Sequence, residues 1–179
     1  MSEIITYVGI WINPLEPKEE MIDIRDIAHA LSLVCRGNGH VKFFYSVAQH
    51  SISCCMEAKA RGYSKEVQLA CLLHDGSEAY LSDMTRPVKR KMPEYREIED
   101  KLQNLIWEKY LGKPLSEEAH KQVFEIDDDI LSYEFKEIMP RSISEDYKNL
   151  RSTPDVRFID PSEIEEKFMA LFHELCHEQ

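Results

Sequence analysis

Apolar side chains recur along most of this chain at intervals of three and four residues, which is the spacing of amphipathic helices. Cap residues, glycines and prolines divide the pattern into six helical segments. These helices are expected at about 23–36, 46–61, 64–75, 93–111, 116–139 and 160–175. Only residues 4–8 and 41–45 favour extended structure. We therefore predict an all-α protein, a bundle of about six helices with a minor β-strand pair near the N-terminus.

The length of 179 residues suits one domain of ordinary size, which can bury a core without disulfides or metals. Within a single domain spanning 1–179 we expect three parts. An N-terminal extension covers 1–22, a helical core with the candidate site covers 23–139, and a polar connection with the last helix covers 140–179. The stretch 140–160 is rich in turn-forming residues and is expected to be a loose connection.

Composition and charge exclude several classes of protein. A hydrophobic fraction of 43% with 31% charged residues is typical of a soluble globular chain. The formal net charge of −11 argues against extended nucleic-acid binding, which needs basic surfaces. The five cysteines form no CxxC pair and are expected to be reduced thiols. Because neither a leader-like segment nor a run of about 18 apolar residues occurs, we expect a cytoplasmic protein with no membrane partner.

The first candidate chemistry is an ionisable pair, His74 and Asp75, which directly follows the apolar run 69–73. Ionisable groups at the end of the most buried helix are costly unless a partner compensates them. Two explanations stay open. The pair either tethers a helix end and caps the next element, or it binds a metal, because imidazole and carboxylate are common metal ligands.

Acidic residues inside the helix predicted at 116–139 are the second signal. Asp127 lies among apolar residues on the inward stripe, so we expect it to face the core. Glu134 lies two turns further along the same face, where it either pairs with a buried cation or marks the rim of the core. Asp128 and Asp129 fall away from the stripe and are expected to be ordinary surface charges.

His50 lies close to the apolar stripe of the helix predicted at 46–61. Taken alone, it has the pattern of a hydrogen-bonded core histidine. Together with His74, Asp75 and Asp127, it supplies two imidazoles and two carboxylates from three helices. This set is a credible coordination sphere for one divalent metal ion, with positions left open for water and substrate.

The spacing of these residues resembles the H…HD…D signature of the HD-domain metal-dependent phosphohydrolases. Three segments carry it: VAQHS at 47–51, LLHDGSEA at 72–79 and IDDDILSYE at 126–134. A fourth, SDMTRPVK at 82–89, resembles the G-D-[LIM]-x-x-P-x-K stretch of the small 5′-deoxynucleotidase-like branch, which includes phage and bacterial proteins. The resemblance covers most of the chain and implies a single all-α HD domain.

Carried over residue by residue, the resemblance implies a ligand set of His50, His74, Asp75 and Asp127 for one divalent ion, which is Mn, Co, Zn, Fe, Ni or Mg. It implies that Glu78 and Asp83 handle the attacking water and the leaving-group proton, and that Arg36 and Lys89 bind the substrate. A carboxylate beside a metal can accept a proton from water, and the planar fork of arginine suits a phosphate.

Some positions depart from the family pattern. Gln49 stands in place of Glu, Ser82 in place of Gly and Ile126 in place of Ala, and none of these changes removes a ligand. Ala79 occupies the place of the second acid in the guanosine-tetraphosphate hydrolases of the superfamily, so that substrate is not expected. His29 points away from its apolar stripe and is expected to be structural or exposed.

The expected function is hydrolysis of a nucleotide phosphate ester by metal-activated water, with a deoxynucleoside 5′-monophosphate as the leading substrate. The alternative on the same site is a deoxynucleoside triphosphate triphosphohydrolase, acting on a substrate such as dATP. A non-catalytic sensor of metal or nucleotide is the alternative from another class. Arg36 and the basic cluster 86–91 would attract the anion locally despite the net charge. The resemblance also implies a homo-oligomer, a dimer or larger.

Overall fold

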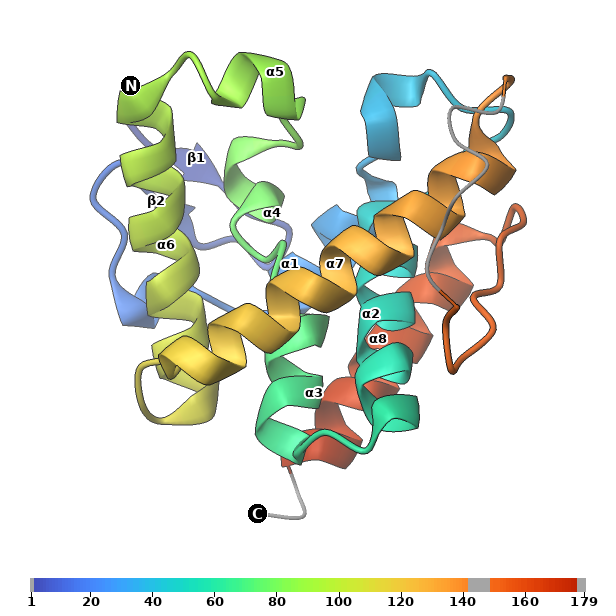
Figure 1. Ribbon diagram of the computed structural model, residues 1–179. Coiled ribbons are helices and arrows are strands. Elements are labelled where there is room, and N and C mark those ends of the chain that lie inside the picture. The colour runs from blue at the N-terminus through green and yellow to red at the C-terminus, as the bar shows by residue number, and fades with distance from the viewer. Residues whose placement is uncertain (1, 142–148, 177–179) are drawn as a thin grey trace.

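The computed structural model describes residues 2–141 and 149–176, and within them the chain is mostly helical (Figure 1). Its helices are α1 (Ile24–Leu33), α2 (Val47–Arg61), α3 (Lys65–Leu72), α4 (Glu78–Leu81), α5 (Arg86–Lys89), α6 (Pro93–Leu111), α7 (Glu117–Ile138) and α8 (Pro161–Cys176). A small antiparallel sheet pairs β1 (Ile4–Ile5) with β2 (Trp11–Ile12). The prediction of an all-α protein with a minor strand pair near the N-terminus is confirmed. The six predicted segments correspond to the long helices, while α4 and α5 are additional.

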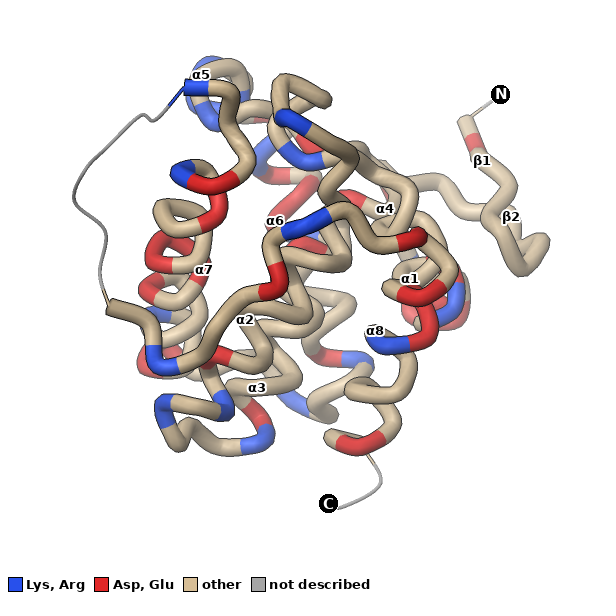
Figure 2. The backbone as a smooth tube through the Cα atoms, turned by 90° about the vertical axis from the view of Figure 1, so that its right-hand side faces the viewer, with Lys and Arg blue, Asp and Glu red and all other residues tan. Residues whose placement is uncertain are grey.

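The bundle is built around α2 and α3, which both contact α7 and α8. Figure 1 shows α7 crossing these two helices on one side, with α8 on the other and α6 standing beside α3. The run Leu69–Leu73 has no exposed surface, as its all-apolar sequence predicts for a helix enclosed on every side. Figure 2 shows the β1–β2 hairpin extending from one edge of the helices.

The segment between α1 and α2 differs from its prediction. Residues 41–45 form no strand, so the expected extended pair is wrong there. A 3-10 turn at Arg36–Gly39 reverses the chain instead, with positive φ at Gly37 and Asn38. The loop is closed by an isolated bridge between Cys35 and Ser46. This closure holds Arg36 beside the start of α2, because its backbone N–H donates to the Tyr45 carbonyl at 2.9 Å.

The end of α3 also differs from its prediction, because the helix stops at Leu72 and leaves His74 and Asp75 in a turn. Gln103 of α6 holds this turn from both sides. Its Nε2 donates to the Leu73 carbonyl at 2.8 Å, and its Oε1 accepts from the Ser77 N–H at 3.0 Å. The turn can lie this close to α6 because residue 76 is glycine, where a Cβ would lie 3.2 Å from the Ile106 side chain.

The connection after α7 carries no helix in its described part, 149–160, in agreement with the predicted turn-rich segment. Residues 142–148 of that prediction lie outside the described residues. The described part is fastened to α2, because the buried Glu57 carboxylate accepts hydrogen bonds from the backbone N–H groups of Arg151 and Ser152. No described helix has the length and apolar character that crossing a membrane requires.

Candidate metal centre

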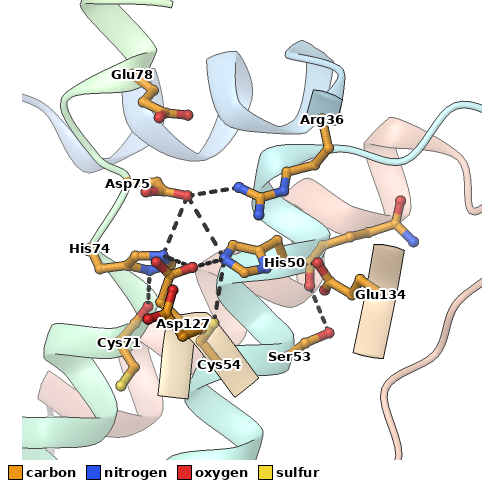
Figure 3. A network of polar contacts seen from close by, with 12 residues as sticks. Arg36, His50, Ser53, Cys54, Cys71, His74, Asp75, Glu78, Asp127 and Glu134 are labelled. Carbon is orange, nitrogen blue, oxygen red and sulfur yellow. Dashed lines mark hydrogen bonds and ion pairs between the residues drawn. The ribbon is translucent and has the colours of Figure 1, made fainter. Parts of the chain in front are cut away.

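The side chains of the four predicted ligands come together in the structure (Figure 3). His50 comes from α2, His74 and Asp75 from the turn after α3, and Asp127 from α7. His50 Nε2 lies 3.0 Å from Asp127 Oδ1 and 4.0 Å from Asp75 Oδ2. His74 Nε2 lies 3.3 Å from Asp75 Oδ2 and 3.8 Å from Asp127 Oδ1. Metal–ligand bonds of ~2.0–2.2 Å place donor atoms about 3–4 Å apart, so these distances fit a single shared ion.

Both imidazole rings are oriented so that Nε2 faces the centre. The Nδ1 of His50 lies 2.8 Å from Oε2 of the buried Glu134, and the Nδ1 of His74 lies 2.8 Å from the Cys71 carbonyl oxygen. Because each acceptor binds the Nδ1–H, the neutral tautomer leaves a lone pair on Nε2. His74 Nε2 is buried and has no hydrogen-bond partner among the described residues. An unsatisfied buried nitrogen among carboxylates is what a metal ligand leaves when the ion is absent, so the donor set fits a metal.

Glu134 has a role that the sequence left open. It is fully buried and accepts hydrogen bonds from the Tyr45 hydroxyl at 2.7 Å and from His50. It therefore orients the His50 ring. It is not at the rim of the core, and no ion pair joins it to a buried Arg or Lys among the described residues. Glu134 lies on the same face of α7 as Asp127, which indicated that it points toward the core. That position alone does not show that its carboxylate contacts the ring of His50.

The electrostatics of the cluster favour a positive charge at its centre. Burial and the Arg36 guanidinium disfavour protonation of His50, but nearby groups including Glu134 and Asp127 outweigh them, so the pKa of His50 lies well above its usual value. Burial alone would raise the pKa of Asp127, but its contacts with the His50 and His74 rings hold that pKa well below its usual value. Both pKa shifts are those of a site where a positive charge is favourable.

Arg36 lies at the edge of the cluster, as its predicted contact with substrate requires, but it already has a carboxylate partner. Its side chain is buried, and Nη1 lies 3.2 Å from Asp75 Oδ2. The buried Nε atom has no partner among the described residues. Arg36 therefore supports a predicted ligand and retains an unused donor.

Glu78 begins α4 and lies beyond Asp75 as seen in Figure 3. Its Oε2 is buried without a hydrogen-bond partner among the described residues. Burial raises the pKa of Glu78 well above its usual value, and the Asp75 and half-buried Asp83 carboxylates raise it further. Lys89, predicted to bind substrate, lies 3.7 Å from Glu78 Oε1 and 2.6 Å from Glu99 Oε1. Lys89 is therefore held in an ion pair within the described structure.

The basic cluster at 86–91 does reach the candidate centre, through Arg86. Its Nη2 lies 2.9 Å from Asp127 Oδ2 and its Nη1 lies 2.8 Å from Asp128 Oδ1. Asp128 is exposed, as predicted. The matching prediction for Asp129 is wrong, because Asp129 is buried and forms an ion pair with Arg61 at 2.9 Å. Asp129 faces the end of α2, where Arg61 compensates its charge.

The fifth donor near the centre is the thiol of Cys54, one of the five cysteines that the sequence predicts to be reduced thiols. Its Sγ lies 3.6 Å from His50 Nε2, and the donor atoms of His50, Cys54 and His74 all lie within 4.8 Å of one another. Burial raises the pKa of the Cys54 thiol to about 11. The five cysteines are free thiols.

His29 lies away from this cluster and has the structural role that was expected. Its ring stacks on Tyr7, with ring centroids 3.6 Å apart, and its Nδ1 lies 2.9 Å from Glu165 Oε2. The contacts fasten the segment after β1 to α1 and α8.

Comparison with known proteins yields relatives whose names state no activity. The chain is 39% identical over 110 residues to the uncharacterized protein YfdR of Escherichia coli strain K12, a match that covers 62% of this chain and 59% of the relative. It is 41% identical over 100 residues to an uncharacterized protein of Rhodobacter capsulatus, covering 52% of this chain and 50% of the relative. The matched part is thus between half and three fifths of each relative's length. No known family profile matches the chain.

Proposed function

We propose that this protein is a metal-dependent phosphohydrolase that cleaves a phosphate ester of a nucleotide, with a deoxynucleoside 5′-monophosphate as substrate. The observation that carries the proposal is the convergence of two imidazoles and two carboxylates around the unpartnered Nε2 of His74. The resemblance of the same residues to the HD-domain phosphohydrolases supports the reaction class.

The metal-binding residues in this proposal are His50, His74, Asp75 and Asp127. A divalent ion held by these residues would act as a Lewis acid toward the phosphoryl oxygen and would lower the pKa of a bound water. Four protein donors would leave room at the ion for water and substrate.

Glu78 is the proton carrier in this proposal. Its carboxyl is buried beside Asp75, and burial raises its pKa, which suits a group that donates a proton to a leaving oxygen. The unpartnered Oε2 is free to accept a hydrogen bond from water. Asp83 lies close enough to raise the pKa of Glu78, which supports its assignment to the same proton path.

Two arginines surround the place where a phosphate would lie. Arg36 lies beside Asp75 and Arg86 beside Asp127, so both flank the cluster from outside the ligand set. Figure 2 marks basic residues along α5, which begins with Arg86. These guanidinium groups place two positive charges beside the cluster, although the whole chain has a net charge of −11. To bind a phosphate, each guanidinium group must either contact the phosphate and its carboxylate together or leave the carboxylate for the phosphate.

The test is phosphate release by metal-stripped protein from a panel of ribo- and deoxynucleoside mono- and triphosphates, after addition of Mn, Co, Zn or Mg. We expect phosphate from deoxynucleoside monophosphates and its loss in His74→Ala and in Glu78→Gln. His120→Ala is the matched control, because it also removes a histidine ring, but one that contacts Trp107 instead of the candidate metal centre. If nucleoside triphosphates are consumed and inorganic triphosphate is released, the protein is a triphosphohydrolase and the monophosphatase proposal fails. Metal and nucleotide binding without turnover of any substrate would replace it by a sensor.

A further inference from the structure

We propose that Cys54 is an additional ligand of the metal centre, and that its sulfur makes the centre selective for a thiophilic divalent ion such as Zn²⁺ over Mn²⁺ and Mg²⁺. The inference rests on the metal centre of the proposed function and is independent of the reaction. The four residues that resemble the HD signature are nitrogen and oxygen donors, so the thiol adds a donor outside that set.

Helix geometry places Cys54 on the metal-facing side of α2. It follows His50 by four residues, so the two side chains lie one turn apart on the same face. Figure 3 shows the Cys54 sulfur below the two imidazoles, and its distance to His50 Nε2 is 3.6 Å. Bonds of ~2.3 Å to sulfur and ~2.0–2.1 Å to nitrogen separate the two donor atoms by about 3.1 Å at a right angle and about 3.6 Å at the tetrahedral angle. The observed spacing therefore fits an ion shared by the two residues.

A second observation points to the same ion. His74 Nε2 is buried without a hydrogen-bond partner among the described residues, and it lies within 4.8 Å of both the sulfur and His50 Nε2. The thiol is fully buried, so water does not compete for it. With Cys54, the proposed ligand set would have five protein donors.

Charge balance is compatible with a bound thiolate. Binding breaks the S–H bond, forms a metal–sulfur bond and releases the proton to solvent. The divalent ion, Arg36 and Arg86 then carry four positive charges, and Asp75, Asp127, Glu134 and the thiolate carry four negative charges. The nearby guanidinium, 3.2 Å from Asp75, thus compensates the charge that a third anionic ligand adds. Soft thiolate ligands select zinc, whereas carboxylate and water suit magnesium and manganese.

The first test needs no variant. X-ray absorption spectroscopy of wild-type protein loaded with one equivalent of Zn²⁺ reports the atoms around the ion directly. We expect one sulfur at ~2.3 Å together with nitrogen and oxygen at ~2.0–2.2 Å. A shell of nitrogen and oxygen alone would overturn the proposal, as would failure of the protein to retain zinc.

The second test compares variants of neighbouring cysteines. Titration of metal-free protein with Co²⁺ should give a thiolate-to-cobalt charge-transfer band in the near ultraviolet for wild type and for Cys55→Ala, and no such band for Cys54→Ser. Cys55 is the matched control, because it is equally buried and adjacent on α2. Far-ultraviolet circular dichroism verifies that each variant is folded.

Metal competition then measures selectivity. We expect Cys54→Ser to lose roughly tenfold or more in Zn²⁺ affinity, the scale of losing a functional partner at a metal site, and to keep its Mn²⁺ affinity within about threefold. Equal losses for both ions would overturn the proposed selectivity. If the cobalt band is present but no phosphate is released from any nucleotide, the ligand assignment stands and the proposed reaction fails. If the protein hydrolyses a nucleotide but shows no cobalt band, the proposed reaction stands and the assignment of Cys54 as a ligand fails.

Discussion

Two buried polar clusters connect α2 with α7, and they differ in how completely their atoms are paired. At one end of α2, Glu57 accepts hydrogen bonds from Ser152 and two backbone N–H groups and pairs with Arg61, which in turn pairs with Asp129. At the candidate metal centre, by contrast, His74 Nε2 lacks a partner among the described residues. Buried polar groups are normally paired, so the complete cluster is explained by stability and the incomplete one supports the proposed metal site.

The same comparison applies to the groups around the centre. Arg36 Nε and Glu78 Oε2 are also buried without a partner among the described residues, and both flank Asp75. Three incomplete groups on one side of the bundle indicate a place prepared for an ion, water and an anion. The following predictions separate a cluster that stabilises the fold from a cluster that binds.

The largest expected effect is on stability, in the cluster around Glu57. Glu57→Gln removes a buried charge that pairs with Arg61 and puts an amide donor opposite backbone N–H groups. We expect the free energy of unfolding to fall by about 3 kcal/mol or more, the scale of breaking a buried ion pair. Metal affinity should stay unchanged. Urea denaturation and metal titration measure the two quantities, with the exposed Glu117→Gln as control. A change of metal affinity in Glu57→Gln would contradict the division between the clusters.

The opposite pattern is expected for His74→Ala. Metal affinity should fall more than about 100-fold, beyond the loss typical of an outer hydrogen-bond partner. The metal-free protein should lose less than ~2 kcal/mol of unfolding free energy, because the substitution also removes an unsatisfied buried nitrogen. Calorimetric metal titration and denaturation of metal-free protein provide both values. If the metal-free variant unfolds and the wild-type protein gains no stability from metal, His74 is structural.

Glu134→Gln should have an intermediate effect, because Glu134 acts on the metal only through His50. Gln keeps an oxygen that can accept the Nδ1–H, but it carries no charge to strengthen that hydrogen bond. We expect metal affinity to fall ~10–100-fold, and Glu134→Asp to restore part of it if the shorter carboxylate still reaches the ring. Isothermal titration with Zn²⁺ measures this series. Unchanged affinity in Glu134→Gln would show that the buried carboxylate does not orient the ligand.

The smallest expected effect is a pH dependence of the Glu57 cluster. Burial opposes the charge of Glu57, but hydrogen bonds from Ser152, Arg151 and Arg61 outweigh it and lower its pKa below the usual 4.5. A carboxyl with a lowered folded-state pKa contributes stability above its unfolded pKa, and that contribution is lost as pH falls through the folded pKa. The stability difference between wild type and Glu57→Gln should therefore shrink below about pH 4.5. Denaturation curves from pH 7 to pH 3 measure it, and a constant difference would contradict the assignment.

Sequence patterns located the long helices and the four candidate ligands, because helical periodicity records which face of a helix is buried. His50 and Asp127 could be placed in this way, although they lie 77 residues apart in the sequence. The short helices α4 and α5 were not predicted, since four residues are too few to show a period. The end of α3 was placed too late, because the clamp by Gln103 comes from a distant helix.

The partners of buried residues could not be predicted from the sequence. Asp129 was assigned to the surface because it falls away from the apolar stripe of its helix. It is nevertheless buried, and only the packing of α7 on α2 supplies its partner Arg61. Glu134 shares the face of Asp127, but its contact with His50 depends on how two helices cross. Cys54 looked like any buried thiol until its distance to His50 was known. A periodic pattern predicts which face of a helix a side chain is on, but the residues that it contacts depend on how the helices pack.

The central claim is that one divalent ion is held by His50, His74, Asp75 and Asp127. The most direct measurement is anomalous diffraction at the zinc absorption edge from crystals of the protein grown with Zn²⁺. The account predicts one strong peak within ~2.0–2.3 Å of the Nε2 atoms of both histidines and of an oxygen of each aspartate. Zinc bound elsewhere, or a hydrogen-bonded cluster that stays free of metal in the presence of Zn²⁺, would contradict it.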